Sequence, residues 1–186
     1  MVAVMTARKF VLPEGDSFEL LESAAMSGGK RVRARIVFKR AGFYVVSHVH
    51  VCQDETYEVL AGELTYLLDG KKHVASAGTT VVLPRGKAHR HFCETGEEVV
   101  LIQTIEPALD FDRFEESIFG LAGEGKLTPV LRLFVQNLVW ARRMKSLTVG
   151  ADAPVWLQRA LAMVIAPIAE LFGYRAVHRR FSGEEW

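Results

Sequence analysis

The chain has 186 residues, of which 49% are hydrophobic and 24% are charged, the balance of a globular protein with a substantial core. This length suits one domain of ordinary size with an extension. The formal net charge of +1 gives no reason to expect nucleic acid or strongly acidic partners. The two cysteines, Cys52 and Cys93, have no pairing motif, and the first residues lack the apolar stretch of a secretory signal. We therefore expect a cytoplasmic protein without disulfides.

Residues from about 17 to 106 have the pattern of β structure. Short apolar runs alternate with glycine-containing turns at even spacing, which is typical of an all-β sandwich or barrel. Asp69-Gly70 separates two such runs and predicts a two-residue hairpin turn. The run from Val99 to Ile102 is typical of a strand that is buried on both faces. We expect a mainly β domain over residues 1–107.

The hydrophobic period changes after Pro107, and residues 108–186 are predicted to form a helical extension. A first helix is expected behind an N-cap at Asp110. Thr128-Pro129 predicts a second helix, with the threonine as N-cap and the proline in the first turn. A third helix is expected over residues 152–172, with a kink at Pro167.

The third helix is apolar along much of its length, and its charged residues argue against a membrane span. Arg159 and Glu170 interrupt the segment, and a charged residue inside a span costs on the order of 3 kcal/mol. We favour packing on the barrel or across a homodimer over membrane contact, because wide apolar stripes do not stay exposed without association. The apolar residues of this segment are Trp156, Ala160, Leu161, Val164, Ile165, Ile168 and Leu171.

Histidines at strand spacing mark a candidate metal site. His48 and His50 are two residues apart, so both side chains point to the same face of a strand. Glu55 follows shortly afterwards, and His89 lies farther along the chain behind a turn. Imidazole nitrogens with a carboxylate suit one divalent transition metal ion, such as Fe, Mn, Ni, Zn or Cu, and disfavour calcium and magnesium.

The wider pattern resembles the two motifs of the cupin family over roughly residues 30–105. The resemblance is to bacterial single-domain cupins, and it implies a jelly-roll β-barrel whose interior metal is bound by residues matching His48, His50, Glu55 and His89. The first motif is Gly42, five residues, His48-x-His50, four residues, Glu55, six residues and Gly62. The second motif is Gly78, five residues, Pro84-x-Gly86, two residues and His89.

One position departs from the family pattern, since Cys93 stands where the second motif usually has asparagine. Residues 89, 91 and 93 share a strand face, so His91 and Cys93 are expected to point into the barrel. Cys93 is either an extra ligand, a redox-sensitive thiol or a substrate contact, or a small buried residue, and we favour the last. His91 is a candidate general acid or base. Tyr57 should also face inward, where it either donates a hydrogen bond to a ligand or packs.

Two classes of function follow from these residues. The first is a metal-dependent enzyme, oxygenase-like, that acts on a small organic molecule inside the barrel with His91 and Tyr57 as catalytic residues. The resemblance also admits isomerases, decarboxylases and lyases, because the fold does not choose among reactions. The alternative is a non-enzymatic metal- or metabolite-binding or sensing module, with membrane association through the helical tail as a weaker variant.

Overall fold

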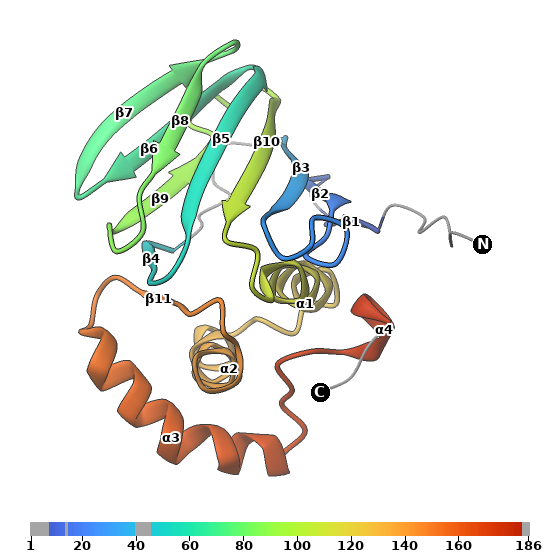
Figure 1. The fold of residues 1–186 in the computed structure, drawn as a ribbon, viewed down its shortest axis with the longest axis vertical. Coiled ribbons are helices and arrows are strands. Elements are labelled where there is room, and N and C mark those ends of the chain that lie inside the picture. Colours follow the sequence, from blue (N-terminus) through green and yellow to red (C-terminus); the bar gives the residue numbers. More distant parts are fainter. Residues whose placement is uncertain (1–7, 14, 40–45, 184–186) are drawn as a thin grey trace.

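The computed structural model of the protein describes residues 8–13, 15–39 and 46–183, and in them two antiparallel sheets form a barrel (Figure 1). The strand order of one sheet is β1-β2-β3-β10-β5-β8, and that of the other is β11-β4-β9-β6-β7. The strands are β1 (Lys9–Val11), β2 (Ser17–Glu22), β3 (Val32–Phe38), β4 (His48–His50), β5 (Asp54–Ala61), β6 (Glu63–Leu68), β7 (Lys71–Ser76), β8 (Thr80–Leu83), β9 (His89–Phe92), β10 (Val99–Glu106) and β11 (Thr148–Gly150).

Helices follow the barrel and gather beyond one end of it, with α3 farthest from the sheets (Figure 1). They are α1 (Phe111–Gly123), α2 (Val130–Arg143), α3 (Val155–Leu171) and the short α4 (Arg179–Ser182). The predicted fold class, a β-barrel followed by a helical segment, is confirmed. The segment is not purely helical, because β11 returns from between α2 and α3 to pair with β4. The domain division at residue 107 stays a prediction.

Local strand predictions agree with the structure. Asp69 and Gly70 both have positive φ, 48° and 78°, and join β6 to β7 with Leu68 opposite Lys71. Both central residues of a type I′ hairpin turn need this conformation. Strand β10 lies between β3 and β5, and its first four residues, 99–102, are all buried, as predicted for a strand covered on both faces.

The helix starts differ from the predictions. Asp110 stands at the N-cap of α1, but its side chain makes no capping bond. Its carboxylate instead accepts the backbone N–H groups of Lys145 and Ser146, at 2.8 and 2.7 Å, and so anchors the segment after α2. Helix α2 begins at Val130, so Pro129 is its N-cap. The hydroxyl of Thr128 donates to the Gly125 carbonyl rather than to the helix.

Helix α3 packs within the chain mainly through small residues. Its buried residues are Ala162, Ala166 and Ala169, and α2 is the helix that it contacts most. Trp156 and Leu171, by contrast, are 71% and 86% exposed. The alanines let the backbones of α2 and α3 approach more closely than bulky side chains would allow, and packing of the larger apolar residues across a homodimer stays a prediction.

The exposed face of α3 carries an apolar stripe, and the helix itself continues through Pro167. We call the residues Trp156, Met163, Val164, Ile168 and Leu171 the outer stripe. Within residues 8–13, 15–39 and 46–183, no helix is both long and apolar enough to span a membrane.

Helix α1 connects the barrel to the other helices through aromatic contacts. The ring of Phe111, at the start of α1, lies 5.3 Å from the imidazole of His50, and Phe114 packs edge-on against Trp140 of α2 at 5.1 Å, both measured between ring centroids. Trp140 is buried and donates its indole N–H to the Ala176 carbonyl at 3.0 Å. The aromatic core therefore runs without a break from the barrel interior into the helices.

Candidate metal centre

The four predicted ligands lie together inside the barrel. His48 and His50 lie on β4, Glu55 on β5 and His89 on β9, where His89 pairs directly with His48. One ligand atom from each of the four residues lies within 4.8 Å of the others, and all four side chains are buried. Gly42, which opens the first motif, is outside the described residues.

Each imidazole is held through its Nδ1 atom. His48 Nδ1 lies 2.9 Å from the Val46 carbonyl, and His89 Nδ1 lies 2.9 Å from the Lys87 carbonyl. His50 Nδ1 lies 2.9 Å from the hydroxyl oxygen of Thr148. A carbonyl can only accept, so in His48 and His89 Nδ1 carries a hydrogen, which leaves Nε2 as the ring atom that can bind a metal. Outer partners of this kind orient the histidine ligands of metal sites.

The carboxylate of Glu55 is oriented in the same way. Its Oε1 accepts hydrogen bonds from the Tyr57 hydroxyl at 2.7 Å and from the Gln103 amide at 2.6 Å. Its Oε2 lies 3.6 Å from Nε2 of His50 and 3.1 Å from Nε2 of His89. Because Oε1 is fully engaged, Oε2 is the oxygen that faces the histidines.

Three buried ligand atoms have no hydrogen-bond partner among the described residues: Nε2 of His50, Nε2 of His89 and Oε2 of Glu55. Unpaired buried polar atoms are costly, so their convergence calls for a cation. Three imidazoles and one carboxylate suit a divalent first-row transition metal, and an octahedral ion would keep positions free for other molecules. The cluster could therefore hold one such ion.

The sequence comparison agrees with this geometry. Residues 35–105 match the family model described as a cupin domain. Residues 35–105 are a cupin domain. All four candidate ligands fall within the matched range, whereas Thr148 does not.

Solved structures with a similar fold share little sequence with this chain. KdgF from Halomonas sp. is 18% identical with a TM-score of 0.46, over 52% of this chain and 83% of that chain. A conserved protein with a double-stranded β-helix domain from Klebsiella pneumoniae is 19% identical with a TM-score of 0.46, over 53% and 84%. A nucleoside dehydratase from Streptomyces is 17% identical with a TM-score of 0.46, over 57% and 80%. No curated relative matches the chain.

The pKa values of the candidate ligands are shifted in different directions. Burial, with the neighbouring histidines His50 and His89, lowers the pKa of His48 well below its usual range. Burial also opposes ionisation of Glu55, but the attraction of the nearby imidazoles of His50 and His89 outweighs it and lowers the pKa of Glu55. Burial opposes protonation of His89, but the neighbouring carboxylate of Glu55, 3.1 Å away, outweighs it and raises the pKa of His89. Glu55 and His48 therefore favour the forms that metal binding needs, whereas a proton on Nε2 of His89 would have to leave before a metal ion binds.

Tyr57 and His91 lie beside the cluster, as predicted for inward-facing residues. The Tyr57 hydroxyl, which donates to Glu55, lies 3.1 Å from Nδ1 of His91, and both residues are buried. Burial and the charge of Glu55 raise the pKa of Tyr57 well above its usual range. Burial lowers the pKa of His91 to about 4. A protonated phenol and a neutral imidazole thus share one hydrogen-bonded network with a ligand, and their catalytic role stays a prediction.

Cys93 points inward but stands apart from the ligands. It is buried, and its thiol donates to the Glu97 carbonyl at 3.0 Å. Among the described residues, Cys93 is not part of the group that could hold an ion. These contacts agree with the favoured interpretation of Cys93 as a small buried residue. Cys52 is exposed.

Sequence reasoning missed two residues that hold the ligands in place. Gln103 lies in the middle of β10, between the buried Leu101 and Ile105. A polar residue at an inward position of an apolar strand could have marked it as a residue of the site. Thr148 had no such signal, because only the return of β11 to β4 brings it opposite His50.

Proposed function

We propose that this protein is a metal-dependent, oxygenase-like enzyme that acts on a small organic molecule inside the barrel. One divalent transition metal ion would be held by His48, His50, Glu55 and His89. The convergence of buried lone pairs without hydrogen-bond partners supports the proposal most directly. The second support is that each ligand is oriented by a partner outside the cluster, the arrangement found around functional metals.

The ion, when bound, would supply Lewis acidity or a site for dioxygen chemistry. The residues around the ion would orient its ligands and move protons. Gln103 and Tyr57 hold one oxygen of Glu55, which leaves the other for the ion. We assign proton movement to Tyr57 and His91, because a phenol hydroxyl 3.1 Å from an imidazole nitrogen is a hydrogen-bonded acid–base pair next to the ligands.

Metal analysis of the purified chain tests the site, and turnover tests the enzyme. We expect one equivalent of a transition metal in the wild type and its loss in the His48→Ala variant. The matched control is His73→Ala, since His73 is an exposed histidine on β7 outside the cluster. Metal-reconstituted protein is then assayed for dioxygen uptake and product formation with diols, thiols and keto acids. Bound metal without uptake or turnover would contradict the enzymatic proposal.

One observation favours a second candidate, a non-enzymatic metal- or metabolite-sensing module. Thr148, which contacts His50, lies on β11, between α2 and α3 in the chain. A movement of His50 on binding of a metal or metabolite would therefore shift β11 and the two helices attached to it. Metal or metabolite addition would then change the oligomeric state or the protection of α2 and α3 from hydrogen exchange, with no product formed. The same additions leaving both quantities unchanged would exclude a sensor.

A further inference from the structure

A row of three ring side chains crosses the sheet from β9 to β7. His91 of β9 is paired with Tyr66 of β6, and Tyr66 is paired with His73 of β7. Residues directly opposite each other in an antiparallel pair point to the same face of the sheet. His91 points into the barrel, where it lies 3.1 Å from the Tyr57 hydroxyl, so Tyr66 and His73 also lie on the inward face.

The exposure of these rings rises along the row. His91 is only 5% exposed, Tyr66 is half-buried and His73 is exposed. Among the described strands, β7 and β8 are the last members of their two sheets, and each pairs with one neighbour only. A residue on the inward face of a closed barrel would be buried. The exposure of His73 therefore shows that solvent reaches the inward face of the sheet along β7.

The ring of Tyr66 is supported on one side. It stacks on the imidazole of His73, with the ring centroids 5.0 Å apart and an angle of 18° between the planes. Strand β6 lies between β7 and β9, so His73 covers the ring face that is turned to β7. The other face is turned toward β9, which carries His89 and His91. Stacking on His73 thus fixes the orientation in which Tyr66 presents a flat face on the side of the metal site.

Tyr66 also lies at a suitable distance from the candidate ligands. Its neighbour Leu68, two residues farther along β6, is paired with His89. Tyr66 is therefore the diagonal neighbour of His89, and such neighbours lie about 7–8 Å apart, within reach of aromatic side chains. A ring attached directly to an oxygen-bearing group at the metal would lie beside Tyr66.

We propose that Tyr66 is a specificity-determining residue of this site, and that its ring face binds a planar, unsaturated ring of the substrate. An oxygen group of the same molecule would lie at the metal. This inference rests on the proposed function and narrows its substrate class to aromatic molecules with a carboxylate or hydroxyl group on the ring. His73 is a positioning residue, because it acts through Tyr66. Offset stacking favours planar rings over saturated rings of the same size, because it adds to the burial of apolar area.

Binding of benzoate and cyclohexanecarboxylate to the cobalt-loaded protein tests the proposal, with cobalt absorption as the readout. Both probes carry one carboxylate on a six-membered ring, and only benzoate is planar. The wild type should bind benzoate about three- to tenfold more tightly. Tyr66→Leu should reduce this ratio to about one with cobalt still bound, and Tyr66→Phe should keep it. Phe92→Leu is the matched control, since Phe92 follows His91 on β9 and points to the opposite face of the sheet.

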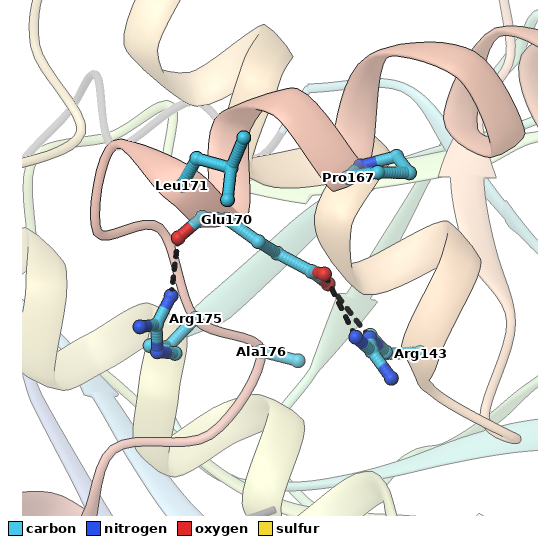
Figure 2. Close-up of a pocket in the computed structure, with 6 residues that line it drawn as sticks. All are labelled: Arg143, Pro167, Glu170, Leu171, Arg175 and Ala176. Carbon is cyan, nitrogen blue, oxygen red and sulfur yellow. Dashed lines mark hydrogen bonds and ion pairs between the residues drawn. The ribbon is translucent and has the colours of Figure 1, made fainter.

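A second place on the molecule could take an anionic probe, the pocket at the end of the outer stripe. Its lining residues are Arg143, Pro167, Glu170, Leu171, Arg175 and Ala176 (Figure 2). Arg143 donates to the Glu170 carboxylate at 2.6 Å, and Arg175 donates to the Glu170 carbonyl at 2.6 Å. The pocket lies on α3, the helix farthest from the sheets (Figure 1). Probe binding there should leave cobalt absorption unchanged, so Arg143→Gln should bind benzoate with the affinity of the wild type.

A cobalt-loaded wild type that binds both probes equally, or neither, would overturn the proposal, as would a benzoate preference that survives Tyr66→Leu or is lost in Arg143→Gln. Nuclear Overhauser effects provide a measurement that needs no variant. In the zinc-loaded wild type, benzoate protons should show these effects to the ring of Tyr66, and their absence would also overturn the proposal. A wild type that takes up neither cobalt nor zinc would instead refute the proposed function, so the two failures are distinguishable.

Discussion

The hydrogen bond between His50 and Thr148 allows a sharp test of how the chain outside the cupin domain supports the metal site. Nδ1 of His50 lies 2.9 Å from Oγ1 of Thr148, and the two residues are opposite each other in the β4–β11 pair. The threonine hydroxyl lies 3.4 Å from the Ser146 carbonyl, to which it donates. Oγ1 therefore accepts the hydrogen of His50 Nδ1, and this leaves Nε2 to face Glu55 and His89.

The substitution Thr148→Val removes this acceptor and keeps the size and β-branching of the side chain. Loss of an outer partner typically lowers metal affinity 10- to 100-fold, which corresponds to about 1.4–2.7 kcal/mol of binding free energy. His50 is only 2% exposed, so water does not replace the lost acceptor. The unpaired N–H should therefore also lower the free energy of unfolding of the metal-free protein by about 1–3 kcal/mol.

Competition with a chromophoric chelator measures the affinity, and urea denaturation of the metal-free protein measures the stability. Thr56→Val is the matched control, because Thr56 is the half-buried neighbour of Glu55 on β5 and points to the other face of the sheet. An unchanged metal affinity in Thr148→Val, in a protein whose His48→Ala variant loses the metal, would refute the reasoning about the outer partner.

Further predictions concern the backbone, the helix pair and pH. Gly62→Ala should destabilise by at least about 3 kcal/mol, because φ is +74° and a Cβ would lie 2.2 Å from the Glu98 carbonyl oxygen. Gly70→Ala, with positive φ but open space, should cost only about 1–2 kcal/mol in the same urea titration. Ala166→Leu should cost about 1–3 kcal/mol by overpacking the α2–α3 contact, and an unchanged denaturation midpoint would contradict that packing. Burial raises the pKa of the Glu115 carboxyl in the folded state, whereas in the unfolded chain it ionises near its ordinary value of 4.5. Stability should therefore fall above this pH by up to about 1.4 kcal/mol per pH unit, and Glu115→Gln should remove that part of the slope.

Much of the candidate site could be predicted from the sequence because its determinants are local. The side-chain period of a strand places His48 and His50 on one face, and turns with glycine at positive φ, such as Gly62, keep neighbouring strands in register. The same alternation placed Tyr57 and His91 inward. Spacing along the chain and the two-residue period were sufficient for these positions, because no distant contact competes with them.

The remaining features depend on contacts between segments far apart in the chain. Thr148 meets His50 because β11 returns to the barrel, and Phe111 meets His50 because α1 begins beside the metal site. The apolar pattern of α3 marked an amphipathic helix correctly but not which face is buried. Large apolar residues gain more from burial than alanines do, yet only the alanine face fits closely against α2, and shape complementarity between two helices is a property of the folded pair.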